Sequence, residues 1–277
     1  MNHTIAQALA AAQRALDGID ARALLRHALG VSDAHLIAHP AQALTDAQSE
    51  LFSALVARRS AGEPVAYITG HGEFFSLELK VTPAVLIPRP ETERLVEFAL
   101  ERIASDGACR VLDLGTGNGC IAISIAKHRL LARVIAVDNS AAALAVARDN
   151  AQRHAVANLE LLESDWFGAL AGQRFDAIVA NPPYVAAGDL HLKQGDLRFE
   201  PATALAAGAD GLDCIRLIVA SAPQYLNHGG WLAFEHGYDQ AARCRELLAQ
   251  AGFSDVFSRT DLAGIERVSG GQWQRQP

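Results

Sequence analysis

The chain has 277 residues, of which 50% are apolar and 20% charged, and its formal net charge is −7. This length suits two domains, and this composition is that of an ordinary globular protein with enough apolar residues for a sizeable core. The acidic balance counts against a protein that grips duplex DNA along many phosphates, because such a protein usually needs a basic surface.

Residues 1–70 predict a small helical domain, because their apolar residues recur at helical spacing without a strand pattern. The predicted helices cover residues 4–16, 20–29, 32–39 and 45–62. Ser32 or Asp33 is expected to cap the third helix, since short polar side chains accept hydrogen bonds from the free N–H groups of a first turn. Thr45 or Asp46 is expected to do the same for the fourth. This part carries no motif with catalytic chemistry.

A short β segment and a helix follow. Residues 72–82 alternate in the manner of a β-hairpin, and we assign residues 71–86 to a linking hairpin. The next helix is expected to begin near Pro90. Glu91 and Glu93 then lie in its first turn, where the helix dipole favours carboxylates.

From Arg110 onward the chain alternates strands and helices. The predicted strands are residues 110–115, 132–138, 159–165, 175–181, 229–237, 253–261 and 265–271. The predicted helices are residues 119–128, 140–154, 212–226 and 238–252. Such alternation predicts an α/β fold with a doubly wound, mostly parallel sheet, which we assign to residues 87–277. The last two strands have no helix between them, so they are expected to form an antiparallel C-terminal edge hairpin.

A glycine-rich turn follows the first strand of this domain. Gly115, Gly117 and Gly119 allow the backbone to turn tightly and to approach a ligand, and Thr116 and Asn118 stand between them. The spacing is G-x-G-x-G, which differs from the G-x-G-x-x-G of dinucleotide-binding turns. The turn therefore favours a ligand without a pyrophosphate.

Three more residues indicate what this ligand is. Asp138 ends the second strand, where a carboxylate can accept both hydroxyl groups of a ribose. Asp165 and Trp166 follow the third strand, where they can bind the amino group of an adenine and stack on its ring. Asp113, inside the first strand, is expected to orient groups near the ligand. A nucleoside without a pyrophosphate suits this set, and the expected ligand is S-adenosyl-L-methionine.

The fourth strand ends in Asn181, Pro182, Pro183 and Tyr184. The prolines stiffen the chain, and Asn181 before them is biased towards an extended conformation. The Asn181 side-chain oxygen and a proline carbonyl can each accept one hydrogen from an NH2 group, and Tyr184 can pack against a flat acceptor. The tetrapeptide therefore predicts binding of a nitrogen conjugated to a π-system, either an amide or the exocyclic amine of a base.

These motifs stand within a longer resemblance. The chain resembles the protein-(glutamine-N5) methyltransferases of class 1 peptide release factors, the PrmC/HemK family, over roughly residues 63–268. The segments that carry the resemblance are GEFFSLELKVTPAVLIPRPETE, VLDLGTGNG, SDWF, NPPYV, LRFEPATALAAGADGL, GGWLAFEHG and IERV. The helical N-terminal part has the expected size and is less specific in sequence.

The resemblance implies a Rossmann-like methyltransferase. Members of the PrmC/HemK family transfer a methyl group from S-adenosyl-L-methionine to the glutamine amide nitrogen of a Gly-Gly-Gln motif, leaving S-adenosyl-L-homocysteine. The implied donor-binding residues are 115–119, Asp138, Trp166 and Asn181, to which the reasoning above adds Asp165. The implied glutamine-binding residues are Asn181, Pro182, Pro183 and Tyr184. Of these, Asn181, Pro182 and Tyr184 are expected to be catalytic, and residues 1–70 to orient the release factor.

Class 1 release factors are thus the expected partner. No apolar run is long enough to cross a bilayer, and the N-terminus lacks the pattern of a signal peptide, so we expect a cytoplasmic protein without membrane contact. The four cysteines stand at no metal or redox spacing, and we expect no metal. We also expect a monomer without a stable nucleic-acid partner.

Other functions remain as alternatives. A nucleic-acid methyltransferase acting on adenine N6 or guanine N2 shares the tetrapeptide, although no target-recognition domain is evident. A non-catalytic module that docks on a release factor is disfavoured because donor and acceptor motifs are both intact. A dinucleotide oxidoreductase is disfavoured by the glycine spacing.

The roles of several residues stay open at this point. Arg89, Glu91 and Arg198 either shape the acceptor entrance, with the loop of residues 185–211, or fix loops through ion pairs. Glu235 and His236 end a strand on the functional rim, where a lone histidine is more often structural. Gln272 follows two glycines and so repeats the tripeptide of the implied substrate, either by chance in a strand end or as a site of self-methylation.

Overall fold

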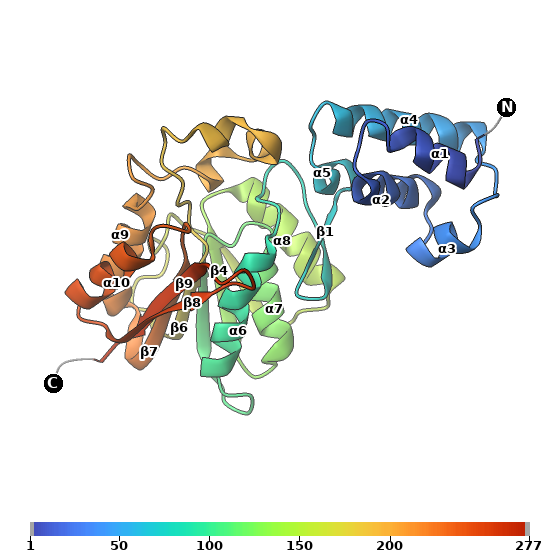
Figure 1. Cartoon of the computed structure of the whole chain (residues 1–277). Coiled ribbons are helices and arrows are strands. Elements are labelled where there is room, and N and C mark those ends of the chain that lie inside the picture. The colour runs from blue at the N-terminus through green and yellow to red at the C-terminus, as the bar shows by residue number, and fades with distance from the viewer. Residues whose placement is uncertain (1–2, 275–277) are drawn as a thin grey trace. The chain divides into compact units, whose positions relative to one another are not determined.

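The computed structural model of the chain describes residues 3–274 and, at Lys193, the backbone alone. The described chain forms two compact units. The first comprises the chain up to His71 together with Gln194–Phe199, and the second comprises Gly72–Lys193 and the chain from Glu200 onward. In Figure 1 the blue and cyan helices belong to the first unit, and the labelled strands from β4 on belong to the second.

The first unit is helical. Its helices are α1 (Ile5–Ala12), α2 (Gly18–Leu29), α3 (Asp33–Ala38), α4 (Asp46–Ser60) and α5 (Val65–Thr69). The helices predicted from the sequence are present, and the hydroxyl groups of Ser32 and Thr45, rather than the neighbouring aspartates, cap α3 and α4. The prediction missed α5, because five residues between Pro64 and Gly70 are too few to display a helical period.

Arg59, near the end of α4, ties the segment Gln194–Phe199 to this unit. Its Nε atom donates to Asp20 Oδ2 at 2.6 Å, and its Nη1 atom donates to Asp196 Oδ1 at 2.9 Å. The Arg59 side chain is 22% exposed, so this pair of contacts is only partly screened by water. One guanidinium thus joins α2 and α4 to a segment that lies far along the sequence.

Arg59→Met is expected to loosen this segment. Methionine keeps an apolar stem but donates no hydrogen bond, so Asp196 loses its partner. Since such ion pairs contribute about 0.2–1 kcal/mol, the amides of residues 195–199 should exchange hydrogen about twofold to fivefold faster. Arg58→Met, which removes only an ion pair with Glu63, is the matched control. Equal exchange in the two variants would contradict the tie.

The second unit is built on a seven-stranded sheet in the order β5-β4-β3-β6-β7-β9-β8. The strands are β3 (Arg110–Leu114), β4 (Arg133–Asp138), β5 (Leu159–Glu163), β6 (Phe175–Ala180), β7 (Leu226–Glu235), β8 (Ser254–Thr260) and β9 (Glu266–Gln272). Strands β3 to β7 pair in parallel, and β9 is antiparallel to both of its neighbours. The predicted doubly wound sheet with an antiparallel C-terminal hairpin is confirmed.

Helices cover both faces of this sheet. They are α6 (Glu93–Arg102), α7 (Cys120–His128), α8 (Ala141–Arg153), α9 (Asp213–Ser221) and α10 (Ala241–Gln250). Successive residues of β3 enter different cores, with Val111 in the core of α6 and α7 and Leu112 in the core of α9 and α10. Figure 1 shows these two pairs of helices on opposite sides of the strands. Burial on both faces explains why the strands are continuous apolar runs.

Prolines shift the bounds of two predicted helices. A 3-10 turn, η1 (Pro90–Thr92), precedes α6, so the α-helix itself begins at Glu93. The helix predicted over residues 212–226 ends at Ser221 and continues as the 3-10 turn η5 (Ala222–Gln224). Pro223 is the reason, because proline lacks the N–H group that an α-helix needs at that position.

No helix among residues 3–274 combines the length and apolarity needed to cross a membrane.

The predicted hairpin is also present, as β1 (His71–Phe74) and β2 (Leu77–Lys80). Asn150 of α8, which is fully buried, anchors its end. The Asn150 Oδ1 atom accepts a hydrogen bond from the Lys80 backbone N–H at 2.7 Å, and its Nδ2 atom donates to the Lys80 carbonyl at 3.0 Å. The same Nδ2 atom donates to the carbonyl of Asn118 at 2.9 Å. The hairpin and the glycine turn therefore share one anchor.

The strand order reverses beside β3, which lies between β4 and β6. The carboxyl ends of parallel strands meet at one edge of a sheet, and ligands of doubly wound folds bind in the crevice at such a reversal. The glycine turn, Asp138, Asp165 and Asn181 each directly follow or end one of these strands. The topology therefore brings the predicted motifs to one edge.

Candidate active site

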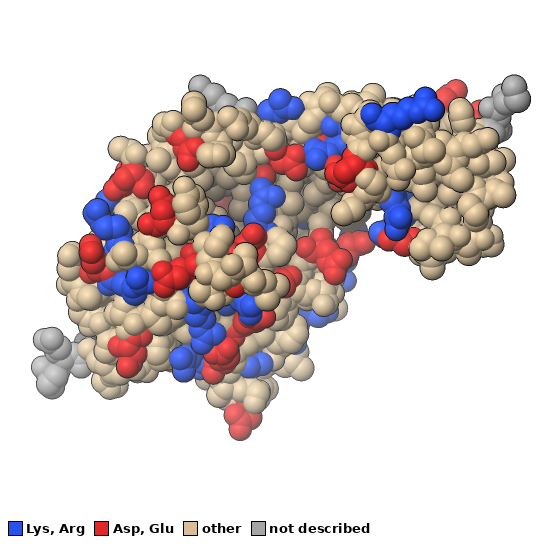
Figure 2. Space-filling view, viewed as in Figure 1, with Lys and Arg blue, Asp and Glu red and all other residues tan. Residues whose placement is uncertain are grey.

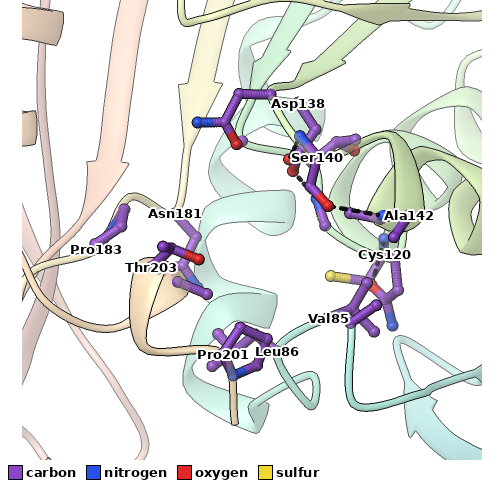
Figure 3. Close-up of a pocket in the computed structure, with 18 of the residues that line it drawn as sticks. Val85, Leu86, Cys120, Asp138, Ser140, Ala142, Asn181, Pro183, Pro201 and Thr203 are labelled. Carbon is purple, nitrogen blue, oxygen red and sulfur yellow. Dashed lines mark hydrogen bonds between the residues drawn. The ribbon is translucent and has the colours of Figure 1, made fainter.

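A cavity of about 360 Å³ opens at this edge of the sheet, a volume within the usual range for small-molecule sites. The predicted donor-binding residues that line it are Gly115, Thr116, Gly117, Asn118, Asp138, Asp165, Trp166 and Asn181. Gly119 is not among the lining residues, and of the other residues in the tetrapeptide only Pro183 is. Figure 3 shows Asp138 and Ser140 together in one part of the cavity and Asn181 near Pro183 and Thr203 in another.

The glycine turn serves two different purposes. Gly117, at φ 56°, has nothing within 4 Å of the position where a Cβ atom would stand, so its backbone borders open space in the cavity. Gly119, at φ 85°, would place a Cβ atom 2.9 Å from Ile123 Cδ1 and 3.3 Å from Ala147 Cβ. Gly117 thus exposes backbone to a ligand, whereas Gly119 allows the turn to pack on α7 and α8.

Asp138 holds the glycine turn in place. Its Oδ2 atom accepts a hydrogen bond from the Gly117 backbone N–H at 2.9 Å, and its Oδ1 atom accepts one from the Ser140 N–H at 2.9 Å. An ionised carboxylate has about four acceptor positions, so about two remain for ligand hydroxyl groups. The sequence predicted a ligand contact for Asp138 but gave no sign of this link between the ends of β3 and β4.

Two buried polar atoms near the turn lack partners among the described residues, Asp113 Oδ1 and Asn118 Nδ2. The other oxygen of Asp113 accepts a hydrogen bond from the Thr116 hydroxyl at 2.6 Å, and the oxygen of the Asn118 amide accepts one from the Cys120 N–H at 3.1 Å. Burial raises the pKa of Asp113 to about 7, against the opposing effect of the Thr116 bond. Asn118 lines the cavity and Asp113 does not, so of these two atoms it is the Asn118 donor that lies beside the ligand space.

Asp113→Asn is expected to change how stability depends on pH. In the unfolded chain the Asp113 carboxyl loses its proton near its ordinary pKa of 3.8, whereas in the folded protein it keeps the proton up to about pH 7. The folded state thus binds more protons within this window, so wild-type stability falls as pH rises through it. Asparagine removes this loss, and the free energy of unfolding of the variant relative to wild type should be higher at about pH 8 than at about pH 5. Urea unfolding measures this difference, and a difference independent of pH would contradict the assignment.

Trp166 lies beside the glycine turn in a strained conformation. Its φ is 48°, which is uncommon for a residue other than glycine, and its ring atom Cζ3 lies 3.9 Å from the Cβ position of Gly115. Ser164 supports this turn, because its hydroxyl donates to the Trp166 carbonyl at 2.9 Å and accepts from the Ala169 N–H at 3.0 Å. Such strain tends to occur at functional sites, and here it presents an aromatic ring to the cavity.

The Asn181 side chain is held from one side. Its Nδ2 atom donates to the Thr92 hydroxyl at 3.1 Å, and its Oδ1 atom takes no hydrogen bond from any described residue. Thr92 ends the turn η1, is 2% exposed and also borders the cavity. The amide therefore keeps a free acceptor at the wall of the cavity.

Tyr184 is not among the described residues that line the cavity, and it donates its hydroxyl hydrogen to Glu235 Oε1 at 2.9 Å. Glu235 ends β7, beside β6, and is 1% exposed. Burial raises the pKa of the Glu235 carboxyl, and the hydroxyl groups of Thr92 and Tyr184 oppose this shift. The Oε2 atom takes no hydrogen bond of ordinary geometry from the described residues, so the Thr92 contact is the looser of the two.

Comparison with known proteins identifies the family. Residues 3–70 match the model of the PrmC N-terminal domain, and residues 93–209 match that of the methyltransferase small domain. The release factor glutamine methyltransferase of Burkholderia pseudomallei is 56% identical over 263 residues, which cover 93% of this chain and 92% of that protein. The protein of the same name from Xylella fastidiosa is 50% identical over 264 residues, covering 95% and 96%. The chain belongs to the release factor glutamine methyltransferase family.

A solved structure supports the fold of this family member. The crystal structure of a methyltransferase from Pyrococcus furiosus matches it with a TM-score of 0.55 at 18% identity, over 80% of this chain and all of that one. As a member of the family, the chain is a methyltransferase whose methyl donor is S-adenosylmethionine. The residues present fit this donor, because Asn118 borders the cavity and its unpaired Nδ2 atom can complement a carboxylate group such as the methionine part of the donor carries.

The sequence left open the roles of Arg89, Glu91 and Arg198, and these residues have different surroundings in this methyltransferase. Arg89 lines the cavity and forms an ion pair with Glu200, whose side chain is fully buried and whose other oxygen accepts from the Ile87 N–H at 3.1 Å. Arg198 belongs to the first unit, where its guanidinium donates to the Ala61 carbonyl at 2.7 Å. Neither Arg198 nor Glu91 is among the described residues that line the cavity. Arg198 thus fixes a loop, whereas Arg89 both pairs with Glu200 and borders the cavity, where it can shape the acceptor entrance.

His236 and Gln272 have structural surroundings. The His236 ring lies 2.8 Å from the Ser269 hydroxyl and 2.8 Å from the Gly237 carbonyl, and burial lowers its pKa. Gln272 lies in β9 and donates to the Gly229 carbonyl at 2.9 Å. The glycine before it, Gly271, would place a Cβ atom 2.9 Å from Phe253 Cβ, so strand packing accounts for a small residue there.

No three His, Cys, Asp or Glu side chains within residues 3–274 are grouped as metal ligands.

Part of the cavity wall consists of residues that were not singled out from the sequence. The additional lining residues are Pro83, Ala84, Val85, Leu86, Pro88, Thr92, Cys120, Ile121, Asn139, Ser140, Ala142, Ala143, Ser164, Pro201, Thr203 and Ala204. Most of these contribute apolar surface or backbone, which carries no chemical signature in a sequence. Pro201, Thr203 and Ala204 of this set lie in the loop of residues 185–211, which was expected to shape the acceptor entrance.

Proposed function

We propose that this chain methylates the side-chain amide nitrogen of the glutamine in the Gly-Gly-Gln motif of class 1 peptide chain release factors. Membership of the family and the match over more than nine-tenths of relatives named release factor glutamine methyltransferase support this reaction. The observation that carries it is the free Oδ1 atom of Asn181 at the wall of the cavity that the glycine turn also borders. A hydrogen-bond acceptor at that place suits a methyl-accepting substrate that presents an NH2 group.

The proposed site has a donor part and a glutamine part. The residues proposed to bind the donor are Gly115, Thr116, Gly117, Asn118, Gly119, Asp138, Asp165, Trp166 and Asn181. The residues proposed to bind the glutamine are Asn181, Pro182, Pro183 and Tyr184. Asn181, Pro182 and Tyr184 are proposed as catalytic, with Tyr184 acting from beside the site because its hydroxyl is engaged by Glu235.

The mechanism rests on orientation and electrostatics. S-adenosylmethionine, when bound, supplies a methyl group activated by a sulfonium. An amide nitrogen is a poor nucleophile because its lone pair is delocalised, so the protein must aim it. Asn181 Oδ1 and the Pro182 carbonyl accept the two amide hydrogens, which directs the nitrogen and stabilises the positive charge that develops on it. The proton then leaves through these acceptors or to water.

We further propose that residues 1–70 orient the release factor, that residues 71–86 link the two parts, and that residues 87–277 carry the chemistry. The match of residues 3–70 to the PrmC N-terminal domain supports the first assignment. We also propose a cytoplasmic monomer without a stable nucleic-acid partner. On the face of the described residues shown in Figure 2, acidic and basic side chains are interspersed and form no continuous basic stripe, which suits a protein substrate.

One experiment tests the proposed function. The protein is incubated with S-adenosylmethionine labelled in its methyl group, a class 1 release factor and bulk nucleic acid. The label is expected in the release factor, at the glutamine of the Gly-Gly-Gln motif by mass spectrometry. A release factor with this glutamine changed to alanine is the matched control and should stay unlabelled. Label in nucleic acid alone would instead support an adenine-N6 or guanine-N2 methyltransferase.

A further inference from the structure

Three elements meet behind the Asn181 amide. Asn181 follows β6, Glu235 ends the neighbouring parallel strand β7, and Thr92 ends the turn η1 before α6. Thr92 and Glu235 are both almost fully buried, at 2% and 1% exposure. Neither is among the residues proposed above to touch donor or glutamine. Thr92 accepts a hydrogen bond from Asn181, and Glu235 accepts one from Tyr184.

The hydrogen-bonding capacities of these side chains fix a direction. Tyr184 donates to Glu235 Oε1, and Oε2 is a buried acceptor to which no described residue donates in ordinary geometry. The Thr92 hydroxyl has a single hydrogen, and like the Tyr184 hydroxyl it lowers the pKa of the Glu235 carboxyl, as a donor to the ionised form does. With that hydrogen directed to Glu235, the Thr92 oxygen can only accept, so it receives the Nδ2 atom of Asn181.

We propose that Thr92 and Glu235 are positioning residues that set which end of the Asn181 carboxamide faces the substrate. The proposal rests on the proposed function, in which Asn181 Oδ1 accepts a hydrogen from the glutamine NH2. A carboxamide is nearly symmetrical in shape, so packing alone does not distinguish its oxygen from its nitrogen. In the reversed orientation Asn181 would present NH2 to NH2, and the substrate nitrogen would be repelled rather than aimed.

Thr92→Val tests the hydroxyl without changing the shape of the side chain. The Asn181 NH2 group then faces a methyl group whenever Oδ1 faces the substrate, and an unpaired buried donor costs about 1–3 kcal/mol. The rate of methyl transfer in a single turnover should therefore fall about tenfold, while the donor dissociation constant and the KM for the release factor change little. Thr92→Ser keeps the hydroxyl and should recover most of the rate. Thr260→Val, the same change at an exposed position at the end of β8, is the control.

Glu235→Gln tests the second positioning residue. Glutamine can present either an oxygen or an NH2 group to Thr92, so the direction of the chain of hydrogen bonds is no longer fixed. A smaller loss, about threefold, is expected in the same rate, again without a change in donor affinity. Thermal unfolding of each variant separates this effect from a loss of folded protein.

A double-mutant cycle decides whether Thr92 acts through Asn181. In the Asn181→Ala background no carboxamide remains to be oriented, so adding Thr92→Val should change the rate by less than about twofold. An equal loss in both backgrounds, no loss in the wild-type background, or a Thr92→Ser variant as slow as Thr92→Val would each overturn the proposal. These outcomes are distinct from failure of the proposed function, in which the wild-type protein would leave the release factor unlabelled.

Discussion

Asn181→Ala is expected to lower the single-turnover rate of methyl transfer to the release factor by about 10²–10³-fold, the scale seen when one preorganised transition-state partner is removed. Alanine keeps the backbone before Pro182 but removes the acceptor for one amide hydrogen of the substrate. The glutamine nitrogen is then neither aimed at the methyl group nor supported as positive charge develops. Saturating donor and release factor isolate this chemical step from binding.

Donor binding is the control for this prediction. Asn181 is one of nine residues proposed to bind the donor and lies in another part of the cavity from Asp138, so calorimetry should find that the donor still binds appreciably. A rate reduced by less than about tenfold would mean that another group holds the substrate nitrogen, and the proposed mechanism would have to be abandoned.

Asp138→Ala is expected to raise the dissociation constant for S-adenosylmethionine by about 10²-fold or more. Two ribose hydroxyl groups would lose a charged acceptor, and each hydrogen bond to a charge contributes about 1.5–3 kcal/mol. The variant also removes the acceptor of the Gly117 N–H, so the glycine turn loses the bond that ties it to the end of β4. Both effects act on the donor and neither acts directly on the glutamine.

Asp138→Asn separates the two effects. Its remaining oxygen can still accept from the Gly117 or the Ser140 N–H, so the turn keeps part of its support while the charge is lost. We expect a smaller increase in the donor dissociation constant, about tenfold, by isothermal titration calorimetry. Unchanged affinity in the alanine variant would remove Asp138 from the donor site.

Much of the fold was predictable because its signals are local. The strands are short β-branched runs bounded by turn residues, and their alternation with helices indicates a parallel sheet. The errors arose where local signals are weak or compete. The helix α5 is too short to show a period, and Pro223 ended α9 within an otherwise helical apolar pattern. Gln194–Phe199 belongs to the first unit through contacts such as the ion pair of Arg59 with Asp196. These two residues are 137 positions apart, so no local sequence pattern predicts the contact.

The part of the candidate site that was predictable consists of residues whose type and local sequence indicate a function. Glycines at G-x-G-x-G spacing, an aspartate at a strand end and an amide before prolines each indicate a function by themselves. The support of these residues depends on pairs distant in the sequence. Thr92 meets Asn181 across 89 positions, and Tyr184 meets Glu235 across 51. Which threonine or glutamate lies behind a site becomes visible only once the strands are in register.

The two units are not consecutive pieces of the chain. The polypeptide passes from one to the other at Gly72, at Gln194 and again at Glu200. A chimera that exchanges substrate recognition between relatives must therefore transplant two segments together, the N-terminal residues and the six residues from Gln194 to Phe199. A graft of the N-terminal part alone would set a foreign helix α4 against the native Asp196. Any mismatch at the Arg59 position would then disturb the loop that follows the tetrapeptide of residues 181–184. Natural variation at these two places is thus expected to be correlated, although they stand far apart in the sequence.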